Sequence, residues 1–161
     1  MLNAAFHLRD AGATLALGGR LAPLLRPGDV VGLSGPLGAG KTSLARGIIG
    51  ALFPGEEAPS PTFALVETYE AAGLALWHFD LYRLEKAGDV FELGLEAALA
   101  EGASLIEWPE RIASHIPDDA LLIRLRPEGG GRRAIATGGG AWARRFEESG
   151  LLRGRESNDK D

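Results

Sequence analysis

Short apolar runs alternate with helical patterns along most of this chain. The run from Val30 to Leu33 comes directly before a glycine-rich segment, and apolar residues then recur at helical spacing from Leu44 to Leu52. Another helical pattern, rich in alanine and leucine, covers residues 10–25. A buried strand, a tight turn and an amphipathic helix in this order are typical of an α/β domain with a central sheet.

Two other parts of the chain predict hairpins instead of strand–helix–strand units. Strand patterns at 63–69 and 74–80 are separated by a short turn, and a second pair at 121–125 and 132–137 flanks a glycine-rich turn. Consecutive strands without a helix between them pair antiparallel, whereas a doubly wound domain would place helices there. We therefore expect a three-layer α/β fold whose central sheet is mixed, with parallel and antiparallel strands.

The remaining segments complete the expected order of elements. Further elements are predicted as an edge strand at 3–8, loops at 27–29 and 54–61, a helix at 90–99, a strand at 104–107, a helical turn from Pro109 and a helix at 142–146. From Ser149 onward the chain is polar and charged. We expect a single domain at residues 1–148 and a flexible polar tail at 149–161.

Composition and charge narrow the class of protein. The chain has 161 residues, which suits one domain, and its hydrophobic fraction of 45% is ordinary for a globular protein. It has no cysteine, no apolar run of membrane-spanning length and no secretory signal, so we expect a cytoplasmic protein without disulfides. The net charge of −5 argues against a broad nucleic-acid-binding surface. Arginines at 132–133 and 144–145 leave a local basic patch open.

The glycine-rich segment carries the strongest chemical signal. Residues 35–42 read Gly-Pro-Leu-Gly-Ala-Gly-Lys-Thr, which is the G-x-x-x-x-G-K-[ST] pattern of a phosphate-binding loop. The glycines at 35, 38 and 40 let backbone N–H groups turn toward one phosphate. The helix that starts near Lys41 adds unpaired N–H groups and the positive end of its dipole.

Two side chains of this loop suit the chemistry of phosphates directly. Lys41 is long enough to reach the β- and γ-phosphates, and the Thr42 hydroxyl is a suitable ligand for Mg²⁺. The alternative is an ordinary glycine-rich turn, but average amino-acid usage gives only on the order of 0.005 such matches in a chain of this length. The sequence therefore predicts a nucleotide-binding protein, and the absence of an N-K-x-D motif favours ATP over GTP.

A phosphate-binding loop needs an acidic partner for Mg²⁺ at the carboxyl end of a neighbouring strand. Glu107 ends the apolar run 104–107, and Asp80 ends the run 74–80. We expect Glu107 to hold the metal or its water shell, and Asp80 to orient the attacking water or the metal-bound waters. The alternative for each residue is an ordinary acid at the end of a strand.

Three neighbouring features have both a functional and a structural interpretation. The segment 60–63, Ser-Pro-Thr-Phe, follows the loop helix, where switch segments of such proteins reach the γ-phosphate, but it also suits a plain proline turn. His78 is interpreted as a histidine that is satisfied within its strand. Trp108 is interpreted as a packing residue that lies near the site because it follows Glu107.

Four segments in this order resemble the bacterial TsaE (YjeE) ATPases of the threonylcarbamoyladenosine tRNA-modification pathway. They are the loop at 35–42, Ser-Pro-Thr-Phe at 60–63, His-Phe-Asp-Leu-Tyr-Arg at 78–83 and Ile-Glu-Trp-Pro-Glu at 106–110. The resemblance implies a P-loop NTPase-like fold with a mixed sheet, binding of ATP and Mg²⁺, and a weak ATPase activity. It also implies that the protein works with the TsaB–TsaD pair, which modifies adenosine 37 of tRNAs that read ANN codons.

By position, the resemblance assigns roles to a set of site residues. Lys41, Asp80 and Glu107 are then catalytic, and Thr42 and Glu107 serve the metal. The residues expected to contact the nucleotide are Thr14, Gly35, Gly38, Ala39, Gly40, Lys41, Thr42, Ser43, Ser60, Thr62, Trp108 and Arg132. Two positions depart from the family pattern, because Pro36 stands where relatives usually carry aspartate and Ala11 replaces a frequent acidic residue.

Two other functions stay open on the sequence. A stand-alone small-molecule kinase has a similar length and the same loop, but it usually has a lid with arginines, and no lid-like insertion is visible. A nucleotide-gated binding module would share the site and differ only in that it does not turn ATP over.

Overall fold

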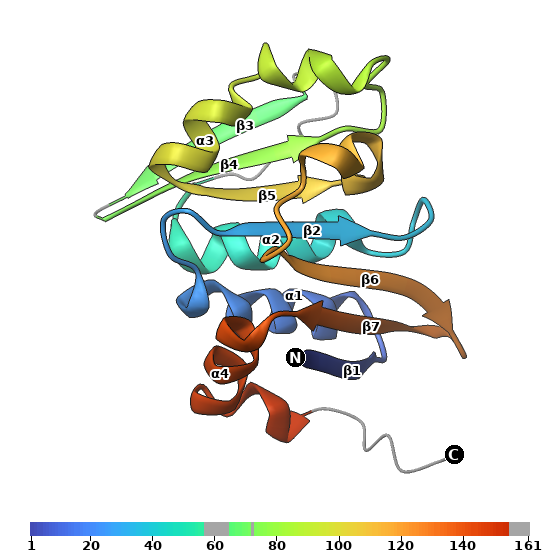
Figure 1. Ribbon diagram of the computed structural model, residues 1–161. Coiled ribbons are helices and arrows are strands. Elements are labelled where there is room, and N and C mark those ends of the chain that lie inside the picture. Colours follow the sequence, from blue (N-terminus) through green and yellow to red (C-terminus); the bar gives the residue numbers. More distant parts are fainter. Residues whose placement is uncertain (57–64, 72, 155–161) are drawn as a thin grey trace.

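A seven-stranded mixed sheet lies at the centre of the computed structural model, which describes residues 1–56, 65–71 and 73–154 (Figure 1). The strands are β1 (Leu2–Leu8), β2 (Val30–Ser34), β3 (Val66–Ala71), β4 (Leu74–Asp80), β5 (Ala103–Glu107), β6 (Leu121–Glu128) and β7 (Gly131–Gly138). Their order in the sheet is β1-β7-β6-β2-β5-β4-β3. The four central strands run parallel, while β1, β7 and β3 pair antiparallel. The expected mixed α/β sheet and both hairpins are confirmed.

Helices cover both faces of this sheet. They are α1 (Ala11–Leu21), α2 (Lys41–Leu52), α3 (Leu95–Glu101) and α4 (Gly140–Glu148), with short 3-10 helices η1 (Ala22–Leu24), η2 (Ala87–Phe91), η3 (Pro109–His115) and η4 (Leu151–Gly154). Figure 1 shows α1 and α2 on one face and α3 on the other. None of the helices in the described part of the chain is long and apolar enough to cross a membrane.

The alternation of side chains along the central strands explains why two core layers form. On β2, Val31 and Leu33 join the apolar cluster under α1 and α2, whereas Val30 joins the cluster under α3 and η3. Leu105 and Ile106 of β5 divide between the two clusters in the same way. A strand buried on both faces reads as a continuous apolar run, which is why these strands were recognisable in the sequence.

The first two helices approach each other unusually closely. Asp10 caps α1, since its side chain accepts a 2.8 Å hydrogen bond from the backbone N–H of Ala13. A Cβ atom at Gly47 would lie 2.3 Å from the carbonyl oxygen of Leu15, and one at Gly18 would lie 2.5 Å from the carbonyl oxygen of Leu44. The backbones of α1 and α2 can therefore touch at Gly18 and Gly47, because these two positions have no side chain to keep the helices apart.

Some element boundaries differ from those expected. The helix expected at 90–99 is divided into η2 and α3, because Gly94 between them takes a left-handed conformation with φ 96°. In the described residues the first hairpin strand begins at Val66, because Leu65 has a positive φ of 63°. The expected start at residue 63 lies outside the described residues. Pro127 lies inside β6 but beyond Arg124, the last residue of this strand that pairs with β2. A proline is tolerated there because, among the described residues, that side of the strand has no neighbour that needs its N–H.

The end of the domain also lies later than the polar composition indicated. We expected a tail from Ser149 onward, but residues 151–154 form η4, and Leu151 is buried in the same core cluster as Trp142 and Phe146 of α4. The hydroxyl of Ser149 accepts a hydrogen bond from the N–H of Leu151, which helps to turn the chain back onto the core. Residues 155–161 lie outside the described ones.

The glycine contact between α1 and α2 gives a test of this packing. Replacing Gly47 by alanine forces a methyl group onto the backbone of α1, and we expect the protein to lose about 1–3 kcal/mol of stability. Gly50→Ala is the matched control on the same helix, since nothing lies within 4 Å of its Cβ position. Alanine is the better helix former, so the control should be neutral or stabilising by up to about 1 kcal/mol. Urea unfolding gives the free energy of unfolding of both variants, and an equal change in the two would contradict the close contact between α1 and α2.

Candidate active site

The carboxyl ends of three parallel strands meet at one edge of the sheet and form a polar cleft. Leu33 near the end of β2 pairs in register with Glu107 of β5, which in turn pairs with Asp80 of β4. The loop that leaves β2 and the start of α2 close the other side. The cleft has a volume of ≈ 280 Å³ and is lined by Leu37, Gly38, Gly40, Lys41, Thr42, Ser43, Asp80, Tyr82, Glu107, Trp108 and Arg132.

The loop at 35–42 has the backbone that its glycines predict. Gly35, Gly38 and Gly40 have φ values of 139°, 77° and 106°, in the region that favours glycine. A Cβ atom at Gly35 would also lie 2.2 Å from the carbonyl oxygen of Leu125, so no other residue fits there without a shift. Gly40 precedes α2 without any side-chain cap, which leaves the positive end of this helix facing the cleft.

Lys41 is buried in the loop, with its ammonium group satisfied by three neighbours. Its Nζ donates to the carbonyl oxygens of Gly35 and Pro36, the latter at 2.8 Å, and lies 4.1 Å from the ring centroid of Trp108. Burial lowers the pKa of Lys41, while nearby carboxylates, Glu107 first among them, act in the opposite direction. The oxygens of a phosphate in the cleft could replace the two carbonyl oxygens as hydrogen-bond acceptors of the Lys41 ammonium group.

Trp108 contributes more to the site than the packing role expected for it. Its backbone is left-handed, with φ 64° and ψ 51°, which is costly for a residue with a large side chain. This conformation turns the ring over the Lys41 ammonium and against Tyr82, at 5.0 Å between ring centroids. Tyr82 itself was missed by the sequence reasoning, although it lies only two positions after Asp80 and its N–H donates to the Asp80 carboxylate at 3.1 Å.

The Glu107 carboxylate is buried and joins two strands to the loop helix. Its Oε1 accepts a 2.9 Å hydrogen bond from the Thr42 hydroxyl, and its Oε2 lies 2.6 Å from Nε2 of His78. His78 was expected to be satisfied within its strand. Instead one ring nitrogen meets Glu107, and the other, Nδ1, is buried and has no hydrogen-bond partner in the described part of the chain.

The donor set around Thr42 suits Mg²⁺ bound together with a phosphate. No group of three or more histidine, aspartate or glutamate side chains able to hold a metal occurs among the described residues. Mg²⁺ does not need such a cage, because it keeps several waters and binds through one or two protein oxygens plus phosphate oxygens. The Thr42 hydroxyl and the Glu107 carboxylate, 2.9 Å apart, supply oxygens of this kind beside the phosphate loop.

The other residues expected at the site divide into three groups. Arg132 reaches the cleft from β7 and donates a 3.3 Å hydrogen bond to the Thr14 hydroxyl, so these two distant positions are brought together. Thr14 is fully buried and, like Gly35 and Ala39, does not line the cleft itself. Ser60 and Thr62 lie outside the described residues.

The arginines considered as a local basic patch go to different partners. Arg132 and Arg133 point to opposite faces of β7, as neighbours on a strand must, and Arg133 lies 3.7 Å from Glu128. Arg145 donates to the Asp29 carboxylate at 2.6 Å and lies over the ring of Trp142. The sequence cluster is therefore not a single surface for polyanions.

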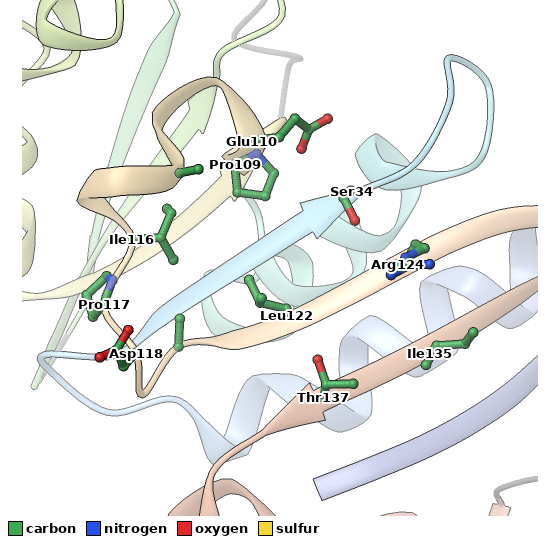
Figure 2. Close-up of a pocket in the computed structure, with 12 residues that line it drawn as sticks. Ser34, Pro109, Glu110, Ile116, Pro117, Asp118, Leu122, Arg124, Ile135 and Thr137 are labelled. Atoms are coloured by element: carbon green, nitrogen blue, oxygen red, sulfur yellow. The ribbon is translucent and has the colours of Figure 1, made fainter.

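A larger cleft lies on the sheet face that η3 and the strands β6 and β7 border (Figure 2). Its volume is ≈ 630 Å³, and its lining includes Pro109, Ile116, Leu122, Arg124 and Ile135. Figure 2 shows Ser34, at the tip of β2, at one end of the lining, and Pro117 and Asp118 at the other. Its lining includes neither the loop glycines nor Lys41, so the larger of the two clefts is not the one formed by the glycine-rich loop.

Comparisons with known proteins agree with this geometry. A family model described as "Threonylcarbamoyl adenosine biosynthesis protein TsaE" matches residues 8–135. Among curated proteins named tRNA threonylcarbamoyladenosine biosynthesis protein TsaE, that of Rickettsia bellii is 39% identical over 128 residues, 78% of this chain and 88% of the relative. That of Treponema pallidum is 41% identical, covering 79% of this chain and 94% of the relative.

A solved structure supports the same assignment. The crystal structure of Bacillus subtilis YdiB superposes with a TM-score of 0.76 at 27% identity, covering 93% of this chain and 95% of that one. The match of the family model spans the loop, both acids and Arg132. The chain therefore belongs to the TsaE family of threonylcarbamoyladenosine biosynthesis proteins.

Proposed function

We propose that this protein binds ATP with Mg²⁺, hydrolyses it slowly, and serves as an accessory factor in the threonylcarbamoylation of tRNA. The observation that carries the proposal is the convergence of Lys41, Thr42, Asp80 and Glu107 on one cleft at the start of α2. A polyphosphate suits this cleft because the loop backbone, the helix dipole and the ammonium group all favour negative charge.

Each of these residues then has a distinct task. Lys41 exchanges the carbonyl oxygens of Gly35 and Pro36 for phosphate oxygens, which keeps its buried charge paired throughout. Thr42 and Glu107 would hold Mg²⁺, which supplies positive charge to the β- and γ-phosphates. Asp80, which is only 7% exposed and lies at the same edge of the sheet, would orient a water toward the terminal phosphate.

The expected slow turnover has a physical basis in the same cleft. Arg132 is the one arginine among the described residues that lines it, and its guanidinium is engaged with Thr14 beside the loop. Fast phosphate-loop NTPases commonly rely on an arginine that stabilises the transition state and can come from a partner protein. We propose that the TsaB–TsaD pair completes the site, and that the cycle supports modification of adenosine 37 in tRNAs that read ANN codons.

Lys41→Ala tests the nucleotide site. Removing the ammonium that faces the phosphates should weaken ATP binding by about 10- to 100-fold, as expected for the loss of a charged hydrogen-bond partner. Lys86→Ala is the matched control, because that lysine is exposed and lies outside the cleft. Titration calorimetry measures both variants. Unchanged ATP binding and turnover in Lys41→Ala would overturn the site assignment.

ATP hydrolysis by the purified chain, alone and with TsaB–TsaD, tests the partner. We expect a slow rate alone and a stimulation of at least about tenfold by the pair, because a completed site gains transition-state stabilisation. ATP binding without turnover under either condition would favour a nucleotide-gated binding module. Transfer of phosphate to a small-molecule acceptor, tested with nucleosides, sugars and shikimate-like compounds, would favour a kinase instead.

A further inference from the structure

We propose that His78 is a positioning residue for Glu107: it fixes the carboxylate in the orientation that meets Thr42, and so sets the affinity of the site for the magnesium complex of ATP. The inference rests on the proposed function and deepens it. His78 does not itself touch the nucleotide cleft, since it is absent from the lining residues. It acts through Glu107.

The geometry connects His78 to the site through one short contact. His78 Nε2 lies 2.6 Å from Glu107 Oε2, and the two side chains are only 1% and 2% exposed. The other carboxylate oxygen, Oε1, accepts from the Thr42 hydroxyl at 2.9 Å. Glu107 is therefore held at both oxygens, and rotation of its carboxylate away from Thr42 would break the contact with His78.

The register of the sheet places the histidine there. His78 and Asp80 are two positions apart on β4, so their side chains share one face of the sheet. Asp80 pairs in register with Glu107, and His78 pairs with Leu105, two positions earlier on β5. Within the pattern His-Phe-Asp, Asp80 therefore lines the cleft, and the imidazole of His78 lies against the carboxylate of Glu107 on the neighbouring strand.

The pattern of hydrogen bonds indicates which nitrogen carries the proton. A carboxylate accepts hydrogen bonds, so His78 Nε2 is the donor of the 2.6 Å contact in the arrangement that we propose. The other ring nitrogen, Nδ1, is buried and has no hydrogen-bond partner among the described residues. An apolar side chain would avoid this unpaired nitrogen. The histidine therefore has a cost in the core that its bond to Glu107 offsets, which favours a role in holding the carboxylate over a role in packing alone.

A pair of substitutions separates these two roles. His78→Leu fills a similar space but cannot donate a hydrogen bond, whereas His78→Gln can place an amide N–H near the position of Nε2. Ser104→Ala is the matched control, because Ser104 Oγ on the adjacent strand β5 is another buried polar atom without a hydrogen-bond partner among the described residues. Ser104 lies three positions before Glu107 on β5, so its side chain faces the opposite side of the sheet. Thermal unfolding verifies that all three variants are folded.

ATP affinity with excess Mg²⁺ and with EDTA is the decisive measurement. His78→Leu should lose about tenfold in affinity for Mg–ATP, the loss typical of residues that orient metal ligands, and less than twofold for metal-free ATP. His78→Gln should recover most of the loss, and Ser104→Ala should match the wild type. An equal loss with and without Mg²⁺ would show a merely structural role, and no loss would also overturn the proposal. If His78→Leu does not fold, His78→Asn replaces it, since its shorter amide reaches only the depth of Nδ1.

A spectroscopic experiment tests the hydrogen bond between His78 and Glu107 in the absence of nucleotide. Nitrogen NMR of the imidazole should show His78 protonated at Nε2, and Glu107→Gln should shift that resonance, because the charged acceptor is lost. The absence of a proton on Nε2, or no response to Glu107→Gln, would overturn the proposal. If the wild type fails to bind Mg–ATP at all, the proposed function is wrong, and this experiment still decides whether His78 holds Glu107.

Discussion

The parallel register of β4, β5 and β2 is the constraint on which the rest of this site depends. Parallel strands end at the same edge of a sheet, and the pairs Leu33–Glu107 and Asp80–Glu107 bring their ends level. The loop that leaves β2 therefore starts beside both acids. A slip of one residue in either pair would turn the acid to the other face, away from α2, because side chains alternate along a strand.

Burial of charge at this edge governs the local chemistry. Lys41 and Glu107 are 5% and 1% exposed, so neither side chain has much water to stabilise its charge. Each is instead satisfied by protein groups, the ammonium by two loop carbonyls and an aromatic ring, and the carboxylate by Thr42 and its contact with His78. Both charges are thus held in place by protein groups, as in a preorganised site.

The supports of the site lie well away from the phosphates. The loop helix α2 is held against α1 by a contact between backbones at Gly18 and Gly47, which leaves little freedom for the start of α2 to shift. On the opposite face, η3 begins directly after Trp108, whose left-handed backbone turns the ring back toward Lys41. The strain at Trp108 is thus localised where the ring faces the reactive groups, as is common at functional sites.

By itself, the sequence determined the phosphate loop with its flanking strand and helix, both hairpins, and the acids Asp80 and Glu107. Each of these features follows from a local pattern of a few residues, such as the spacing of glycines, the alternation of apolar and polar residues, or an acid at the end of an apolar run. The break at Gly94 escaped this reasoning because a helical pattern continues across it, and a left-handed glycine is visible only in the backbone.

Only the tertiary structure decided the contacts between distant segments. Glu107 meets His78 and Thr42 across 29 and 65 positions of sequence, and Arg132 meets Thr14 across 118. These pairs depend on the order and register of strands in the sheet, which local periodicity does not encode. His78 shows the difference most clearly, because its strand was predicted correctly while its partner could not be. The physical reason is that periodicity assigns a side chain to a face, and only the neighbouring strand decides what it meets there.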